Sequence, residues 1–309
     1  MTDVAAIQEQ AAGAADALIK QLAPALPDVR ARIADFIRAC EPLGPLDHYK
    51  VFPAPAQAIV AAVAQTHDSA TLRRFLRAVL ASAVLQTVNG ARFRALPPRT
   101  AANQARHLLR IAQDADAQAP WLALDQDLFQ KEFGLATLRL YAAGSQLVDY
   151  RCGVPRSTVL AEGMARALPK LLTMVKLGGF RPYFQIHTHK FNLDAFHEAG
   201  WEECYLCCAE LYAVHPEVLG MYGSSWFYDP ALATISPRLA YLRDTPGNNG
   251  AALMFVVKGG DAINNATATS TSRRQLYEEG KYAPTNYMLV WGRDAQRAWA
   301  ARRLAAQAG

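Results

Sequence analysis

The spacing of apolar residues changes once along this chain of 309 residues, close to Leu135. Before that position, apolar side chains return every three or four residues, as they do from Thr71 to Val88, and this period is typical of helices with one buried face. Beyond it, apolar and polar side chains alternate in short stretches such as Tyr183 to His189, which is typical of strands. We therefore predict a helical region over residues 1–130 and a mixed α/β domain over residues 131–309.

Turn-forming residues mark the ends of the elements expected in the second region. Glycines such as Gly178 and Gly179 interrupt the apolar patterns, because their backbone preferences end helices and strands. The expected strands cover residues 135–140, 146–150, 183–189, 218–228, 239–243, 253–258 and 287–291, and the expected helices cover residues 157–177, 193–214, 272–279 and 294–306. With the N-terminal helices packed on such a mixed sheet, the predicted fold class is α+β, and α/β is the alternative.

The composition excludes several classes of protein. Apolar residues make up 51% of the chain, so a large core can be buried, and the net charge is +5. The arginines are scattered along helices, unlike the concentrated basic surface of a nucleic-acid-binding protein. The sequence has no run of about 18 apolar residues, the length that a membrane-spanning helix needs. The segment from Met1 to Ala12 lacks the pattern of a secretory signal. We expect neither nucleic acid nor a membrane as a partner.

The five cysteines indicate the compartment. Their number is odd, and Cys204, Cys207 and Cys208 are clustered, whereas a secreted disulfide framework would be spaced differently. Reduced thiols fit a cytoplasmic protein. We expect a cytoplasmic location and a small-molecule substrate, and a homo-oligomer is compatible with these features.

Histidines at alternate positions follow Pro182. In a strand, Gln185, His187 and His189 would share one face, and His197 lies close enough in sequence to join them. Two or three imidazoles with an open position are the ligand set of catalytic zinc and non-haem iron, so Zn or Fe is a candidate cofactor. The alternative interpretation is a pair of histidines that bind backbone and solvent at the end of a strand.

An aromatic segment with two glycines runs from Gly220 to Pro230. A glycine within a strand indicates a bulge or the close approach of another group. Asp229 at its end is a candidate general base, although an Asp-Pro pair also opens turns. The side chains expected to line a substrate pocket here and on the histidine strand are Gln185, Tyr222, Ser224, Trp226 and Tyr228.

A glycine turn and a hydroxyl-rich helix start lie between Lys258 and Arg274. Backbone N–H groups and the helix dipole at such a start favour a phosphate or a carboxylate. The spacing is not that of a P-loop, and a capped helix beside a loop explains the same residues. The candidate anion-binding residues are Ser270, Ser272, Arg273 and Arg274.

The C-terminal region resembles the last helix and strand of the GNAT acyltransferases, in the segment from Ser272 to Tyr282 and the strand from Tyr287 to Trp291. In that family a helix with Leu-Tyr-Glu precedes a strand, and its tyrosine protonates the departing thiolate of coenzyme A. The resemblance implies this role for Tyr277 and acetyl-CoA or another acyl-CoA as cofactor. The segment from Pro246 to Leu253 resembles the family's pyrophosphate loop, which implies that Asn248 and Gly250 contact phosphates.

Three functions remain open. The leading one is an acyltransferase that moves an acyl group from a CoA-type thioester to a small amine or hydroxyl, with His187, His189 or Asp229 as base and Tyr277 as acid. The second is a metal-dependent hydrolase or oxygenase that uses His187, His189 and His197. The third is a non-catalytic metabolite-binding or interaction protein with an aromatic wall near Trp226.

Overall fold

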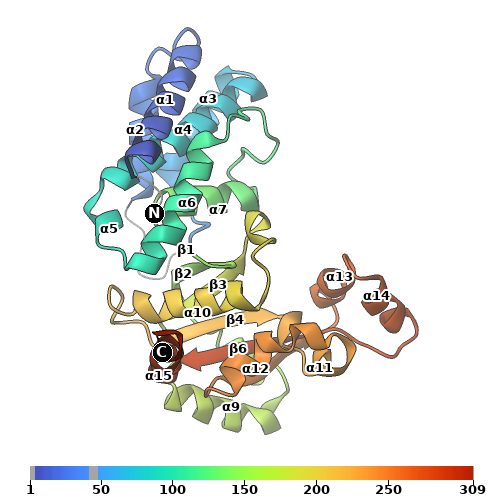
Figure 1. Cartoon of the computed structure of the whole chain (residues 1–309). Helices are drawn as coiled ribbons and strands as arrows, with labels where there is room; N and C mark the ends of the chain where they lie inside the picture. The colour runs from blue at the N-terminus through green and yellow to red at the C-terminus, as the bar shows by residue number, and fades with distance from the viewer. Residues whose placement is uncertain (1–3, 42–47, 309) are drawn as a thin grey trace. The chain divides into compact units, whose positions relative to one another are not determined.

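The computed structural model describes residues 4–41 and 48–308 (Figure 1). Within these residues it contains fifteen α-helices and six strands, and the strands pair in both parallel and antiparallel directions. The α+β class predicted from the sequence is therefore confirmed. The chain divides into two compact units: unit 1 comprises Met1–Arg151 and His189–Phe191, and unit 2 comprises Cys152–Thr188 and Asn192–Gly309. This division falls after Arg151, whereas the sequence pattern placed it near residue 130.

Unit 1 consists mainly of helices with apolar residues on their buried faces. They are α1 (Val4–Leu22), α2 (Val29–Cys40), α3 (Ala54–Thr66), α4 (Ser69–Asn89), α5 (Ala91–Arg94), α6 (Pro98–Gln113) and α7 (Asp127–Ala136). Helix α4 packs against α1, α2, α6 and α7, and nearly every residue from Phe75 to Val84 is buried. A helix that is apolar on all sides belongs at the centre of a core, and α4 occupies that place in unit 1.

Unit 1 also contains one β-hairpin. Strands β1 (Leu140–Ala143) and β2 (Gln146–Cys152) pair antiparallel, with Tyr141 opposite Val148. Gly144 adopts a φ of 52° in the turn between them, a conformation that glycine takes at little cost. The hairpin was predicted, but its first strand was placed too early, because Leu135 belongs to helix α7.

Unit 2 alternates strands with short helices. Its elements are α8 (Ser157–Leu160), α9 (Met164–Lys176), β3 (Tyr183–Thr188), α10 (Glu198–Leu211), β4 (Gly220–Ser225), η2 (Trp226–Tyr228), α11 (Leu232–Ile235), η3 (Pro237–Leu239), α12 (Tyr241–Gly247), β5 (Ala252–Lys258), α13 (Asp261–Thr267), α14 (Thr271–Glu278), β6 (Thr285–Gly292) and α15 (Arg293–Ala308); the 3-10 turn η1 (Lys190–Asn192) crosses the boundary between the units.

The strands of unit 2 follow the order β3-β4-β6-β5. β3 and β4 run parallel, and two positions pair between them: Phe184 with Met221 and Gln185 with Tyr222. β6 pairs antiparallel with both β4 and β5. Gly220 allows this pairing, because a Cβ atom there would lie 2.3 Å from the carbonyl oxygen of Trp291.

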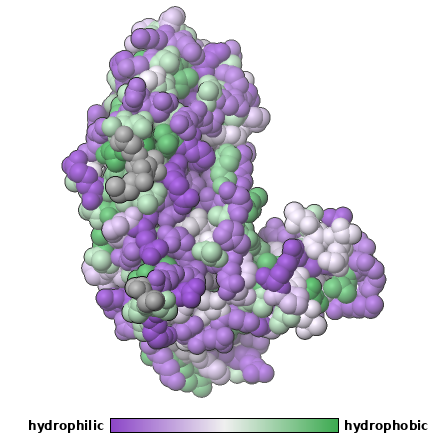
Figure 2. Space-filling view, viewed as in Figure 1, coloured by the Kyte–Doolittle hydropathy of each residue, from purple (hydrophilic) through white to green (hydrophobic). Residues whose placement is uncertain are grey.

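Helices cover both faces of these strands (Figure 1). On one face, Met174 of α9 joins a core cluster with Tyr183, Tyr222 and Val290. On the other face, α10 and α15 pack together, and α15 contacts β4 and β6. In Figure 2, hydrophilic residues dominate the visible surface, and hydrophobic residues appear at its lower margin, where α9 lies in Figure 1.

Some elements of unit 2 differ from the sequence predictions. The strand predicted over residues 239–243 is wrong, because Pro237 begins a helical turn that leads into α12. The helix predicted over residues 157–177 is two helices, and Gly163 separates them with a φ of 80°. The helix predicted from residue 193 begins only at Glu198. None of the described helices combines the length and apolar composition that a bilayer-crossing helix needs.

Candidate functional site

The three histidines proposed as metal ligands have separate surroundings. His189 is fully buried in unit 1, and its Nδ1 accepts a hydrogen bond from the backbone N–H of Phe191 at 3.3 Å. His197 is exposed and caps helix α10, because its Nδ1 accepts a hydrogen bond from the N–H of Gly200 at 3.2 Å. His187 lies half-buried in β3. The structure does not bring these three side chains together as one ligand set within the described residues.

A different group of metal-ligating side chains is present at strand β2. Ligand atoms of His48, Asp149 and Cys152 lie within 4.8 Å of one another, and in the described part of the chain this is the one such group of three or more. Asp149 and Cys152 belong to the same strand. Burial lowers the pKa of His48, although the nearby Asp149 carboxylate opposes this shift. Such a nitrogen, oxygen and sulfur set suits zinc.

Sequence reasoning missed this group. His48 and Asp149 are about 100 residues apart, so no local spacing connects them, and the cysteine alone carries no ligand signal.

The predicted general base has a structural role. Asp229 is buried, and one carboxylate oxygen accepts a hydrogen bond from the N–H of Ala231 at 3.0 Å. The other accepts a hydrogen bond from the N–H of Thr285, at the start of β6, at 3.1 Å. The carboxylate therefore joins the turn after β4 to the first residue of β6.

The predicted pocket side chains have different environments. Tyr222 is buried in the core cluster beneath α9, and Trp226 is buried in a second cluster with Leu232 and Tyr282. The hydroxyl of Tyr228 occupies the space where a Cβ atom of Gly223 would be, at 2.6 Å. Gln185 is half-buried and Ser224 is exposed. The aromatic side chains of this segment therefore contribute chiefly to packing.

The arginines predicted to bind phosphate are engaged by the backbone. Arg273 is buried, donates to the carbonyl oxygen of Ala266 at 2.6 Å, and lies 4.6 Å from the ring centroid of Trp226. Arg274 donates to the carbonyl oxygens of Thr267 and Ala268, both at 3.3 Å.

The other predicted cofactor contacts lie at helix ends. Ser270 caps α14 by accepting a hydrogen bond from the N–H of Arg273, and its hydroxyl is 3.2 Å from that of Ser272. Asn248 and Gly250 follow α12 and are exposed. Tyr277 on α14 is 38% exposed.

A buried polar network was not predicted from the sequence. Glu132 of α7 is inaccessible to solvent. Its two carboxylate oxygens accept hydrogen bonds from one guanidinium nitrogen of Arg110, at 2.8 and 2.7 Å. The Nε2 atom of His189 lies 3.0 Å from the Oε1 atom of Glu132. Burial acts to raise the pKa of Glu132, but His189 and Arg110 hold it below its ordinary value. His107 packs edge-on against His189 at 5.8 Å, and burial with the Arg110 charge lowers the pKa of His107 to about 3.

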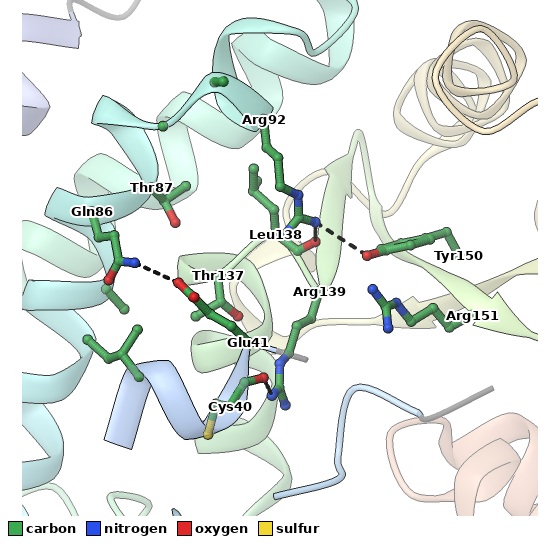
Figure 3. Close-up of a pocket in the computed structure, with 14 residues that line it drawn as sticks. Cys40, Glu41, Gln86, Thr87, Arg92, Thr137, Leu138, Arg139, Tyr150 and Arg151 are labelled. Atoms are coloured by element: carbon green, nitrogen blue, oxygen red, sulfur yellow. Dashed lines mark hydrogen bonds between the residues drawn. The ribbon is translucent and has the colours of Figure 1, made fainter. Parts of the chain in front are cut away.

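One concave site of unit 1 is a pocket of about 430 Å³ (Figure 3). Its lining comes from the end of α2, the end of α4 and the start of α5, the segment between α7 and β1, and the end of β2. The lining residues are Ile37, Cys40, Glu41, Ala83, Gln86, Thr87, Gly90, Ala91, Arg92, Thr137, Leu138, Arg139, Tyr150 and Arg151. We call this site the arginine pocket, because three arginines and one carboxylate are among its described lining residues.

The arginines reach the pocket from separate elements, as Figure 3 shows. Arg92 donates to the carbonyl oxygen of Leu138 at 2.8 Å and to the hydroxyl of Tyr150 at 3.3 Å. Arg151 lies over the ring of Tyr150, with its guanidinium carbon 5.0 Å from the centroid. Arg139 is buried and donates to the carbonyl oxygens of Cys40 and Val51.

A helix end with an unusual residue directs Arg139 into this site. The N–H of Arg139 bonds to the carbonyl of Gly134, and the N–H of Leu138 bonds to that of Leu135, which is a Schellman ending of α7. Leu138 takes the left-handed position of this motif, with a φ of 53° that glycine usually supplies. Strained backbone of this kind concentrates at binding sites.

The lining of the pocket also contains an acidic group and a thiol. Gln86 donates to a carboxylate oxygen of Glu41 at 2.6 Å, on the side of the pocket facing α4 (Figure 3). Burial raises the pKa of Cys40 to about 11, so its thiol is neutral at physiological pH. The pocket thus combines a cationic wall with an apolar wall that includes Ile37 and Ala83.

Comparison with protein-family models, curated proteins and solved structures found no match for this chain.

Proposed function

We propose that this protein binds a small organic anion in the arginine pocket. The observation that carries the proposal is the convergence of Arg92, Arg139 and Arg151 on one cavity of about 430 Å³. Guanidinium groups suit carboxylates and phosphates, because their planar N–H donors match the geometry of the oxygens. The three guanidinium groups of the lining would attract an incoming anion.

The lining also supports a ligand with an apolar part. Ile37, Ala83 and Leu138 are buried apolar residues of the same pocket. Pockets of roughly 300–1,000 Å³ accommodate metabolite-sized ligands. We therefore infer that the ligand is a carboxylate or phosphate monoester with a short hydrocarbon chain. The pocket should bind a cation with the same hydrocarbon chain more weakly.

Four probes with the same hydrocarbon chain test this proposal: hexanoate, hexyl phosphate, hexylamine and hexanol. We expect hexanoate or hexyl phosphate at millimolar concentration to raise the melting temperature by about 2 °C or more, and hexylamine to leave it unchanged. The increase should fall at high salt, since the site is partly open to solvent.

Arginine variants locate the site. Arg92→Ala and Arg151→Ala should weaken the binding of the anion at least about tenfold. Arg94→Ala is the matched control, because Arg94 lies on the same short helix α5 as Arg92 but is absent from the pocket lining. The proposal is wrong if no anionic probe stabilises the protein, or if Arg94→Ala weakens binding as much as Arg92→Ala.

Acyl transfer from a CoA-type thioester is a second proposal, and the β3–β4 pair favours it. These parallel strands are in register at only two positions, and ligands of open α/β sheets bind at the carboxyl ends of such strands, which here carry His187 and Ser224. In the reaction the amine substrate would lose a proton and the CoA thiolate would gain one, a role for Tyr277.

Thiol release measures this activity directly. Purified protein incubated with acetyl-CoA and a mixture of small amines should release free CoA thiol, and Tyr277→Phe should slow release about 100-fold. Arg151→Ala should leave the rate unchanged, which separates this activity from the arginine pocket. Absence of amine-dependent thiol release would remove the acyltransferase proposal.

Metal-dependent chemistry remains a third proposal, with Zn or Fe as the ion. The group His48, Asp149 and Cys152 supports it better than the three histidines predicted from the sequence. Metal analysis of the purified protein should find about one equivalent of zinc, lost in His48→Ala and retained in His187→Ala. Zinc lost in His187→Ala and retained in His48→Ala would instead favour a site formed by His187, His189 and His197. Absence of metal would contradict the proposal.

The cysteines support a cytoplasmic location as part of these proposals. All five are buried thiols. A reducing compartment maintains such thiols without cross-linking.

A further inference from the structure

Helix α9 carries an apolar stripe that unit 2 leaves uncovered. Met164, Leu168, Leu171, Leu172 and Val175 are each between 42% and 79% exposed. They occupy positions i, i+4, i+7, i+8 and i+11, and this spacing places them on one face of a helix. We call this set the α9 apolar face. Exposed apolar side chains gathered on one surface often mark an interaction site.

A different side of α9 already anchors the helix. Ala167, Lys170 and Met174 are its buried residues, and Met174 reaches the core cluster under the sheet. The ammonium group of Lys170 donates to the carbonyl oxygens of Thr158 and Phe255 and pairs with Glu162 at 2.9 Å. The α9 apolar face is therefore not required to hold the helix in place.

In the described chain, the charged side chains on and beside α9 that form no ion pair are all basic. Exposed Arg166 and Lys176 lie on α9 itself, and exposed Arg156 and Arg181 lie on the segments just before α8 and after α9. Within residues 4–41 and 48–308, none of these four cations takes part in an ion pair. The acidic side chain of α9's approach segment, Glu162, is already paired with Lys170.

We propose that the α9 apolar face lies on the surface of an anionic lipid bilayer. A helix with leucine, methionine and valine on one side and basic side chains on its polar sides inserts its apolar side at the headgroup boundary. Lys176 and the arginines would lie at the level of the headgroups, where negative surface potential attracts them.

A second copy of the chain is the less favourable occupant. Pairing of α9 with itself would join two helices that both carry Arg166 and Lys176, and like charges oppose such an interface. The net charge of +5 per chain acts in the same direction.

Vesicle co-sedimentation of the full chain tests the proposal. We expect binding to vesicles of phosphatidylcholine with phosphatidylserine at least tenfold stronger than binding to phosphatidylcholine alone, and weaker binding as salt rises. Leu168→Gln combined with Leu172→Gln should weaken binding at least tenfold. Leu193→Gln is the matched control, because Leu193 is 61% exposed, close to the 62% of Leu168, and lies outside α9.

A charge variant and the oligomeric state complete the test. Arg166→Gln combined with Lys176→Gln should remove the preference for phosphatidylserine, whereas Arg297→Gln on α15 should not. Absence of binding to either vesicle overturns the proposal. A dimer in light scattering that Leu168→Gln dissociates, without vesicle binding, would also overturn it and identify a second copy as the occupant.

Discussion

One guanidinium nitrogen of Arg110 lies 2.8 and 2.7 Å from the two carboxylate oxygens of Glu132. The carboxylate is inaccessible to solvent, and His189 contacts it from another side. A buried charge of this kind is tolerated only when its partners stay in place. The stability of unit 1 therefore depends on a polar cluster between α6 and α7 as well as on its apolar core.

Glu132→Gln should destabilise the protein by about 3 kcal/mol. The change leaves Arg110 without its buried counter-charge, while the shape of the side chain is almost conserved. Urea unfolding followed by circular dichroism measures the loss. Asp127→Asn is the control on the same helix, because its carboxylate, which pairs with Lys50 and Lys131, is about half exposed. Equal losses in the two variants would contradict the proposed importance of burial.

The buried histidine should make stability fall as the pH is lowered. The pKa of His107 is about 3 in the folded protein and near its ordinary 6.5 when unfolded, so between these values only the unfolded chain takes up the proton. Stability should decrease by roughly 1.4 kcal/mol for each pH unit in this window. Below pH 4.5, the ordinary pKa of a glutamate, the lowered pKa of Glu132 adds to this loss of stability.

His107→Asn should flatten this dependence between roughly pH 6 and pH 5. Unfolding free energies of the wild type and the variant across this interval measure the difference. His67→Asn at the end of α3 serves as the control. An unchanged slope in His107→Asn would show that other groups cause the pH dependence.

Gly220→Ala should destabilise the protein by about 3 kcal/mol. The added Cβ would lie 2.3 Å from the backbone oxygen of Trp291, which cannot move without breaking the β4–β6 pairing. Gly13→Ala provides the opposite case, because nothing lies within 4 Å of its added Cβ inside α1. That variant should gain about 1 kcal/mol from helix propensity. Melting temperatures that shift in the same direction would contradict this account.

Asp229→Ala should lower stability by about 2 kcal/mol, because it leaves the N–H groups of Thr285 and Ala231 without their acceptor. Asp229→Asn retains one carbonyl oxygen and should lose less. Thermal unfolding of both variants measures this order. A large loss of acyl-transfer rate in Asp229→Asn with unchanged stability would instead support the catalytic role predicted from the sequence.

The sequence predicts the elements of unit 2 where apolar alternation is regular. The strand expected over residues 287–291 lies within β6, and the strand over 253–258 lies within β5. The prediction failed over 239–243, where a short apolar run is equally compatible with a helical turn. It misplaced the first hairpin strand because Leu138 ends α7 in a conformation usually marked by glycine.

The site residues were harder to predict than the fold. Asp229 and Ser270 form the turns and caps that their residue types also favour, so local sequence could not separate the two roles. The arginine pocket brings Arg92 within reach of Tyr150, 58 residues away, and no spacing rule connects them. The metal group around His48 is equally non-local.

The α9 apolar face was visible in the sequence only as part of a regular helix pattern. Periodicity shows which residues share a helix face, but not how much of that face the rest of the protein covers. The expectation that no membrane is a partner rested on the absence of a spanning segment, and a helix lying at a bilayer surface needs none.

The segment His189–Phe191 belongs to unit 1, although the residues on either side of it belong to unit 2. This limits where the chain can be cut to produce unit 1 alone. A truncation ending at Arg151 would retain Glu132 and Arg110, yet it would remove the imidazole 3.0 Å from the carboxylate and the Phe191 ring 4.2 Å from the Arg110 guanidinium. In such a fragment the buried carboxylate of Glu132 would lose part of its shielding from solvent. The fragment should aggregate or remain partly unfolded when expressed alone. Supplying the missing tripeptide through a grafted loop would be the minimal repair.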